Sequence, residues 1–146
     1  MENIVKDLNA FLSNLNVFYR KLQNYHWNVI GKDFFVFHSK LEEYYDKINE
    51  QIDEIAEHIL MLNGQPLGTM KDYLQNTSIQ EAKNVKVKDS EVFETIIKDY
   101  TLLLENVTNV KKEADEQTDY LTSSLMDDYI LDYTKILWML QQMMQS

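Results

Sequence analysis

Four long stretches of the sequence repeat apolar residues at alternating steps of three and four, and this spacing limits the fold more than any other feature. Residues spaced in this way lie on one face of an α-helix. The four apolar stripes are Ile4, Leu8, Phe11, Leu15, Phe18, Leu22, Tyr25 and Val29; Phe37, Leu41, Tyr44, Ile48, Ile52, Ile55, Ile59 and Leu62; Phe93, Ile96, Tyr100, Leu103, Val107, Val110 and Ala114; and Met126, Ile130, Tyr133, Leu137, Leu140 and Met144. Only three glycines and one proline are present, which leaves little room for sheets or linkers. The sequence therefore predicts an all-α fold.

The short connections between the stripes predict which helices are neighbours. A few residues around Gly31 separate the first two helices, and Asp33 is placed to cap the second. The sequence Asn-Gly-Gln-Pro at 63–66 ends that helix, because Gly past the last turn followed by Pro is a common stop signal. Helices three and four are separated only by residues 116–121. Each short connection makes its two helices antiparallel neighbours.

Residues 64–88 form a much longer connection, between the second and third helices. About 25 residues without a long apolar stripe indicate a crossover with a short helix of its own, at 69–74, with Thr69 as its cap. A four-helix bundle with one long crossover has the ferritin-like topology. We therefore predict an all-α, ferritin-like four-helix bundle with a short helix in the crossover, formed as a single domain by residues 1–146.

Composition excludes several kinds of function. The chain has no cysteine, which excludes disulfides, thiolate metal sites and cysteine nucleophiles. The N-terminal sequence lacks the apolar block of a secretory signal, and no segment reaches the roughly 20 apolar residues needed to cross a bilayer. The net charge of −10 repels nucleic acid phosphates and anionic lipids and attracts cations. We expect a cytoplasmic protein that does not bind membranes.

Two of the three histidines, His26 and His38, flank the predicted turn between the first two helices. On a helical wheel with His38 at zero, three carboxylates fall on one flank beside the apolar stripe. They are Glu42 at about 40°, Asp53 at about 60° and Glu57 at about 100°. His58 falls at about 200° and is expected to lie on the solvated surface. The second helix thus carries a set of candidate metal ligands.

One chain cannot bring these candidate ligands together. His38 and Asp53 are about 22 Å apart along the helix axis. His26 and His38 can meet at one end, and Asp53 and Glu57 lie one turn apart at the other, but each pair alone offers too few ligands. In a two-fold dimer with antiparallel second helices, the histidine end of one chain meets the carboxylate end of the other. Such mixed nitrogen and oxygen ligands suit iron, zinc or manganese.

Simpler interpretations of these residues stay open at this point. A histidine in a helical hairpin is commonly a packed core residue, and the second helix is acidic throughout, so some carboxylates one turn apart are expected by chance. The Glu-x-x-His motif that di-iron bundles use is absent, because position 55, three before His58, is Ile. An ordinary di-iron centre within one chain is therefore not expected.

Three sequence motifs point to a known family. They are His-Trp-x-Val-x-Gly-x-x-Phe-Phe-x-x-His at 26–38, Asp-x-x-Ala-Glu at 53–57 and Gly-x-Pro-x-Gly-Thr at 64–69, and Lys135, Leu137 and Trp138 fit the last helix. With these motifs the chain resembles the Dps family, the DNA-binding proteins from starved cells, which are also called miniferritins. The resemblance extends over nearly the whole chain. Trp27, inside the first motif, lies next to the candidate site, where packing is its simplest role and the quenching of stray radicals is the alternative.

The resemblance implies which residues bind metal and what the protein does. In Dps-like proteins the two histidines of one subunit and an Asp and a Glu of its two-fold mate form a ferroxidase site, which implies His26, His38, Asp53 and Glu57 here. Glu42 stands where family members usually carry Asp, and it keeps the charge. The implied function is the oxidation of Fe(II), preferably by hydrogen peroxide and otherwise by dioxygen, with storage of ferric mineral in a hollow dodecamer.

The resemblance also implies acidic pores for iron entry, formed by the segment before the last helix. Candidate pore residues are Asp115, Asp119, Asp127 and Asp128, and Ser124 occupies a position where a pore Asp is expected. A solvated acidic loop explains each of them equally well. Family members that condense DNA usually do so through basic tails, which this chain lacks. We expect no DNA binding at physiological salt; a nucleoid-binding protein and a structural shell protein with a degenerate metal site are the alternatives.

Overall fold

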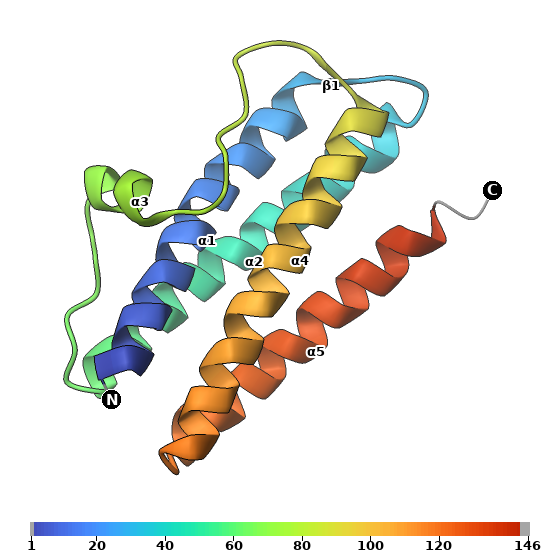
Figure 1. The fold of residues 1–146 in the computed structure, drawn as a ribbon. Coiled ribbons are helices and arrows are strands. Elements are labelled where there is room, and N and C mark those ends of the chain that lie inside the picture. Colours follow the sequence, from blue (N-terminus) through green and yellow to red (C-terminus); the bar gives the residue numbers. More distant parts are fainter. Residues whose placement is uncertain (1, 144–146) are drawn as a thin grey trace.

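The computed structural model describes residues 2–143, most of which lie in helices. The helices are α1 (Glu2–Asn28), α2 (Phe34–Met61), α3 (Met70–Asn76), α4 (Asp89–Glu116) and α5 (Tyr120–Gln142), and the strands are β1 (Val29–Ile30) and β2 (Val87–Lys88). Figure 1 shows the long helices side by side, α1 next to α2 and α4 next to α5, with α3 against α1. The predicted all-α four-helix bundle with a short helix in its crossover is confirmed.

The predicted apolar stripes form the core of the bundle. Every residue of the first stripe is buried in α1 and β1. Some residues of the other stripes are only half-buried, namely Tyr44, Ile52, Leu62, Phe93 and Ile130; Met144 lies outside the described residues. Burying one large aliphatic or aromatic side chain contributes roughly 1.5–3 kcal/mol. The shared core therefore explains why the four long helices associate.

The end of α2 differs in detail from the prediction. The residue in the left-handed conformation is Asn63, at φ 62°, and not Gly64. Asn tolerates this conformation better than most residues with a side chain. Gly64 donates a hydrogen bond from its N–H to the Ile59 carbonyl (2.9 Å), and a Cβ at Gly64 would lie 2.8 Å from a Val5 methyl. Gly64 therefore serves close packing against α1 rather than a positive φ.

The crossover is held against α1 by polar contacts. Thr69 caps α3 as predicted: its hydroxyl oxygen accepts from the Asp72 N–H (3.1 Å) and its hydroxyl donates to the Asp72 carboxylate (2.8 Å). On α1, the Asn9 amide donates to the Gln65 carbonyl and accepts from the Leu67 N–H. These contacts fix the path of a long segment that buries few apolar side chains of its own.

A pair of very short strands, which the sequence did not predict, ties the α1–α2 turn to the start of α4. Val29 pairs with Val87 and Ile30 with Lys88 in parallel register. The turn that follows β1 contains Gly31 at φ 134°, and the Asp33 N–H donates to the Asp89 carboxylate (3.0 Å). Asp33 occupies the predicted cap position of α2, but its side chain makes no capping hydrogen bond. The turn is therefore held from α4 rather than by its own cap.

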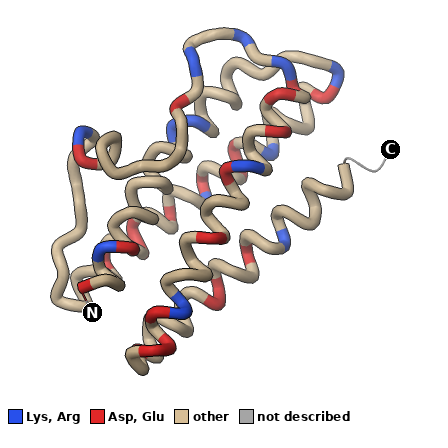
Figure 2. The backbone as a smooth tube through the Cα atoms, in the orientation of Figure 1, with Lys and Arg blue, Asp and Glu red and all other residues tan. Residues whose placement is uncertain are grey.

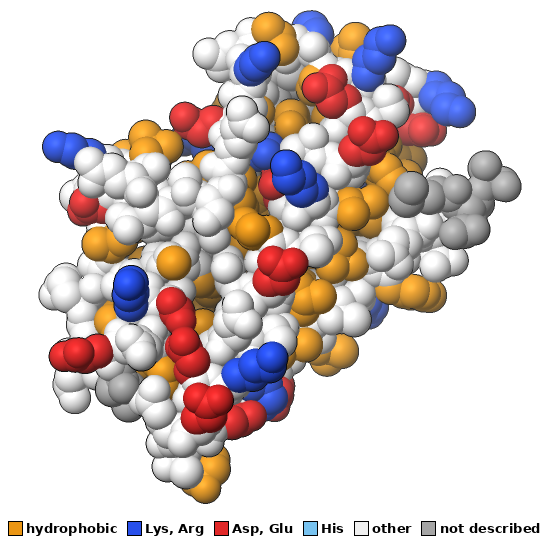
Figure 3. All heavy atoms as spheres, viewed as in Figure 1, with side chains coloured by type: hydrophobic (Ala, Val, Ile, Leu, Met, Phe, Trp, Pro, Cys, Tyr) orange, Lys and Arg blue, Asp and Glu red, His pale blue; other side chains and the backbone are white. Residues whose placement is uncertain are grey.

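The surface combines charged and apolar groups. Figure 2 marks the positions of acidic residues along the long helices and of basic residues gathered around the crossover and the α1–α2 turn. Hydrophobic side chains reach the surface between these charges (Figure 3). Phe35, Tyr120 and Leu131 are the most exposed of the large ones. Within residues 2–143, no helix combines the length and the apolar character that crossing a membrane requires.

Candidate metal centre

His26 and His38 lie side by side at the end of the bundle that contains the α1–α2 turn. His26 is in the last turn of α1 and His38 is in the second turn of α2, so the short connection brings them opposite each other. Their ring centroids are 3.8 Å apart and their planes differ by 11°, which means that the imidazoles are stacked. Phe34 also stacks on His38, at 5.0 Å. The prediction that the two histidines meet is confirmed.

Each imidazole is oriented by the backbone of the opposite helix. Nδ1 of His26 lies 2.6 Å from the carbonyl oxygen of His38, and Nδ1 of His38 lies 2.8 Å from the carbonyl oxygen of His26. A carbonyl oxygen only accepts, so Nδ1 carries the hydrogen in both neutral rings. Nε2 of each ring then carries the lone pair that a metal ion needs. Metal-binding histidines are commonly oriented in this way.

Glu42 lies one turn after His38 on α2. Its Oε1 atom is 3.7 Å from Nε2 of His26, and its side chain is exposed to solvent. This distance is too long for a hydrogen bond but places a carboxylate beside the free nitrogen of the ring. The histidine end of the chain therefore has two imidazoles and one carboxylate in the same region, as candidate ligands.

Asp53 and Glu57 lie towards the other end of α2, one turn apart and exposed. They line a surface pocket of about 490 Å³, whose other residues are Glu50, Glu54, His58, Met61, Leu121 and Leu125. Along α2, Asp53 is about 22 Å and Glu57 about 28 Å from His38. Within residues 2–143, no three His, Asp or Glu side chains are grouped closely enough to hold a metal ion. A site that combines the histidines with Asp53 and Glu57 requires a second chain.

The prediction that His58 lies on the surface is wrong. Its side chain is 4% exposed, and Nε2 lies 2.7 Å from the Thr122 hydroxyl oxygen of α5. Thr122 donates its own hydroxyl to Asp119 (2.6 Å), so Nε2 of His58 is the donor to Thr122. Burial lowers the pKa of His58, against smaller opposing effects of Asp119 and Glu54. The helical wheel failed here because α5 covers this flank of α2 and supplies a polar partner.

The four candidate pore residues have different environments. Asp127 is paired with Lys111 at 2.8 Å, and Asp115 lies 4.0 Å from the same ammonium. Asp119 caps α5, since its carboxylate accepts from the Thr122 N–H. Asp128 is exposed and lines a pocket between α2 and α5. The sequence analysis did not single out Lys111, whose positive charge neutralises Asp127 and Asp115. Asp128 is therefore the one of the four candidates that these ion pairs and this cap do not involve.

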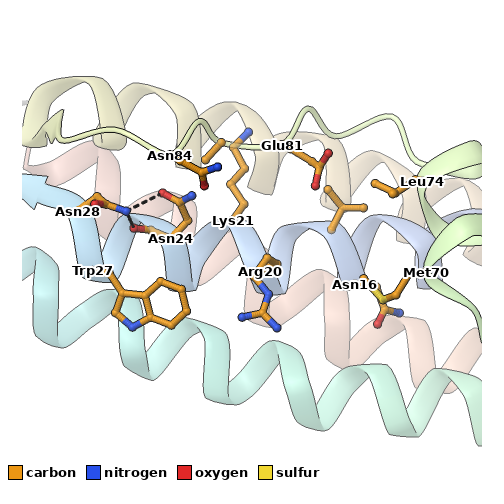
Figure 4. A pocket seen from close by; sticks show the side chains of 12 residues that line it. Asn16, Arg20, Lys21, Asn24, Trp27, Asn28, Met70, Leu74, Glu81 and Asn84 are labelled. Atoms are coloured by element: carbon orange, nitrogen blue, oxygen red, sulfur yellow. Dashed lines mark hydrogen bonds between the residues drawn. The ribbon is translucent and has the colours of Figure 1, made fainter.

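Trp27 follows His26 in the sequence but points elsewhere. It is 57% exposed and borders a pocket of about 300 Å³ between α1, α3 and the crossover. Figure 4 shows its indole on the same side of α1 as Arg20, while Asn24 and Asn28 are joined by hydrogen bonds. Trp27 therefore packs only partly within the chain, and a packing role for it stays a prediction.

Comparisons with known proteins place these features in context. A family model of ferritin-like domains matches residues 5–146. DNA protection during starvation protein 2 of Bacillus anthracis is 38% identical over 140 residues, covering 96% of this chain and 95% of that protein. General stress protein 20U of Bacillus subtilis (strain 168) is 37% identical over 140 residues, covering 96% of both.

A similar solved structure is that of a DPS protein from Vibrio cholerae O1, described as a member of a broad superfamily of ferritin-like diiron-carboxylate proteins. Its TM-score is 0.93 at 34% sequence identity, and the match covers 98% of this chain and 89% of that one. The similarity therefore includes the helices, the crossover and the turn that carries the two histidines.

Proposed function

Because this chain belongs to the ferritin-like domain family and, within it, to the Dps proteins, we propose that it is a miniferritin that oxidises Fe(II) and stores the ferric product. The observation that carries this proposal is the orientation of His26 and His38, whose Nδ1 atoms face backbone carbonyls. A histidine that only packs in a core usually has both ring nitrogens hydrogen-bonded. These two instead each keep one nitrogen for a ligand.

Two chains related by a two-fold axis complete the proposed site. His26 and His38 of one subunit face Asp53 and Glu57 of its mate, and Glu42 adds a carboxylate to the histidine side. The separation of the two pairs along α2 supports this arrangement, because an antiparallel mate brings its carboxylates to the histidines. Imidazole and carboxylate ligands suit Fe(II), and zinc and manganese compete for the same donors.

The proposed reaction is a two-electron reduction of hydrogen peroxide by two Fe(II) ions. Each Fe(II) gives up one electron; one peroxide takes both electrons and two protons and becomes two waters. Dioxygen is the alternative oxidant. The protein residues hold the two ions close together, and their carboxylates balance the positive charge that each iron gains. Hydroxyl radical is not released when both electrons arrive together.

We also propose that the dimers assemble into a hollow dodecamer that holds the ferric mineral. Exposed apolar side chains support further contacts between subunits, because contiguous apolar surface on a folded chain commonly marks an interface. The most exposed examples are Phe35, Tyr120 and Leu131. The net charge of −10 per chain draws Fe(II) towards the assembly.

The test is Fe(II) oxidation by the metal-free protein, followed by absorbance with peroxide and separately with dioxygen, and then sizing chromatography with iron detection. We expect fast oxidation by peroxide and iron that elutes with a large assembly. In the double variant His26→Ala/His38→Ala, the rate of Fe(II) oxidation is expected to fall about 10- to 100-fold or more, while the assembly stays unchanged. Glu43→Ala, an exposed neighbour of Glu42, is the control and is expected to keep the wild-type rate.

Unchanged oxidation in the double histidine variant would show that the site is elsewhere. Slow oxidation by the wild-type protein, with no iron retained in the assembly, would contradict the proposed function itself. Retention of zinc or manganese without oxidation of iron would favour a structural metal site on the same residues.

A further inference from the structure

Arg20 is the only arginine of the sequence, and its charge is not paired within the chain. It lies exposed on α1, and within residues 2–143 its guanidinium makes no ion pair or hydrogen bond. Figure 4 shows Arg20 and the exposed indole of Trp27 on the same side of α1, opposite Lys21, whose ammonium is buried against Asp99 at 2.7 Å. A guanidinium carries five N–H donors, so Arg20 is free to bind a carboxylate outside the chain.

The contacts between α1 and α2 fix the level of Arg20 along the bundle. His26 stacks on His38, and further from the turn the ring of Tyr19 meets that of Tyr45, with centroids 5.9 Å apart. Both pairs follow one register, in which each step back along α1 is matched by one step forward along α2, as expected for antiparallel helices of equal rise. Arg20 is therefore level with position 44 of its own α2.

The proposed two-chain site fixes the level of the mate in the same way. It places His38 opposite the midpoint between Asp53 and Glu57 of an antiparallel α2. Asp46 of one chain then lies opposite position 47 of the mate, so the two Asp46 side chains meet beside the two-fold axis. Arg20 is within about 5 Å of both of them along the helix axis.

The flank of α2 that would face the mate is strongly acidic. On the helical wheel, its carboxylates fall between about 40° and 120° from His38. Two such flanks repel each other when they meet in a two-fold dimer. The proposed metal centres neutralise the carboxylates near the two ends of this contact but not those at its middle. The exposed acids of the flank are Glu42, Asp46, Glu50, Asp53 and Glu57.

The lysines of this stretch of α2 do not neutralise the middle of the contact. Lys40 and Lys47 fall at about 200° and 180° on the same wheel, away from the flank. Their ammonium groups lie 3.4 Å from Glu43 and 3.8 Å from Glu50 of their own chain. Asp46 makes no ion pair within residues 2–143. An unpaired guanidinium and an unpaired carboxylate therefore lie at nearly the same level of the proposed interface.

We propose that Arg20 is a positioning residue that binds Asp46 of the two-fold mate and so sets the register of the two-chain metal centre. This inference rests on the proposed function, because the proposed ligands define that register. A guanidinium can hold two carboxylates at once, so the two Arg20 side chains neutralise the two Asp46 side chains at the axis. The exposed indole of Trp27 adds apolar surface beside this ion pair, as is common at the centre of an interface.

The test measures dissociation of the metal-free protein by sedimentation velocity over a dilution series. Arg20→Glu is expected to dissociate at a concentration about 10-fold higher or more, because four carboxylates then meet at the axis. Asp46→Arg is expected to have a similar effect, since four cations then meet. The double variant Arg20→Glu/Asp46→Arg restores opposite charges and is expected to assemble nearly as well as the wild type.

Two control variants separate this contact from other effects of charge. Arg20→Glu/Glu43→Arg is the matched control, because Glu43 is level with Arg20 of its own chain and already has a partner in Lys40. It is expected to assemble as poorly as Arg20→Glu. Lys98→Glu, exposed on α4, is expected to assemble like the wild type. Circular dichroism is expected to show the same helix content in all variants, since the substituted side chains are exposed.

Fe(II) oxidation gives a measure that misfolding would not reproduce. Arg20 does not touch the proposed iron site, so Arg20→Glu is expected to oxidise Fe(II) slowly in dilute solution. Its rate per chain is expected to approach that of the wild type at high protein concentration, where the dimer forms again. A misfolded variant would stay slow at every concentration.

The inference and the function on which it rests fail in different ways. Dissociation of Arg20→Glu at the wild-type concentration overturns the role of Arg20, and so does a double variant Arg20→Glu/Asp46→Arg that assembles no better than Arg20→Glu. Recovery of assembly with Glu43→Arg also overturns it, since the pair would then lie within one chain. Recovery with Asp46→Arg in a protein that does not oxidise Fe(II) supports the contact and overturns the ferroxidase.

Discussion

The tautomer of a histidine decides which ring nitrogen can bind a metal ion. At His26 and His38, hydrogen bonds from Nδ1 to backbone carbonyls set this tautomer. Spacing in the sequence predicted that the two side chains meet, because they flank a short turn between antiparallel helices. Spacing could not predict the exchange of hydrogen bonds with each other's carbonyls, which depends on how the two helices cross. His58 was misplaced for a related reason: its partner Thr122 comes from a distant helix.

Substitutions of Glu42 test whether the candidate centre needs the negative charge of this side chain or its exact length. Glu42→Gln is expected to slow Fe(II) oxidation at limiting iron by about 10-fold or more, because the carboxylate beside Nε2 of His26 loses its charge. Glu42→Asp keeps the charge and is expected to stay close to the wild-type rate. Stopped-flow absorbance measures both rates, and Glu43→Gln is the control. Equal rates for Glu42→Gln and the wild type would show that Glu42 is not a ligand.

Glu113 links stability to pH at the other end of the bundle. Burial, and then the hydrogen bond and charge of Asp7 on α1, raise the pKa of Glu113 to about 7. The folded chain therefore binds this proton more tightly than the unfolded chain, where the carboxyl has its ordinary pKa. The resulting stability is complete below the unfolded pKa and is lost as the pH rises through about 7.

Glu113→Gln removes this titration. Its melting temperature is expected to exceed that of the wild type at about pH 8 and to match it more closely at about pH 5. Thermal unfolding followed by circular dichroism measures the difference, with the exposed Glu105→Gln of the same helix as control. A difference between wild type and Glu113→Gln that is the same at both pH values would contradict this origin of the pH dependence.

At the scale of elements, the turn between α1 and α2 matters most, because it sets the distance between the two histidines. Periodicity predicted both helices and their antiparallel arrangement, since a long amphipathic stripe has one clear period. The strand pair β1–β2 and the Asp89 contact could not be predicted, because they join residues 29–33 to a segment more than fifty positions away. A two-residue strand also leaves no periodic signal. The Asp33 side chain therefore does not cap α2 as predicted, and the Asp33 N–H instead donates a hydrogen bond to the Asp89 carboxylate of α4.

Gly31→Ala tests the importance of this turn. A Cβ at Gly31 would lie 2.3 Å from an Asp89 carboxylate oxygen, and φ of 134° is strained for any residue with a side chain. We expect a loss of about 1–3 kcal/mol in the free energy of unfolding, measured by urea denaturation, together with slower Fe(II) oxidation. Gly68→Ala is the control, because its Cβ would meet nothing within 4 Å. Equal stability of the two variants would show that the turn tolerates a side chain.

At the scale of the whole molecule, the chain has a ferritin-like bundle that carries half of the proposed ligands at each end of α2. The topology was predictable because the four stripes and one long connection allow few arrangements. The dodecamer was implied only by the resemblance and stays a prediction, since surface residues such as Phe35 and Leu131 carry no periodic signal of their partner. Because the net charge is −10, we still expect that the protein does not bind duplex DNA at physiological salt. A gel shift by metal-free, unaggregated protein would contradict that expectation.

The most direct measurement of the two-chain site combines two inactive variants in one dimer. One chain carries His26→Ala/His38→Ala, and the other carries Asp53→Ala/Glu57→Ala. Each variant alone is expected to be inactive. In a purified mixed dimer, one site receives both sets of mutations and the other receives none, so about half of the wild-type Fe(II) oxidation rate is expected to return. If the site lay within one chain, each chain would remain damaged, and a mixed dimer as inactive as its parents would contradict the two-chain site.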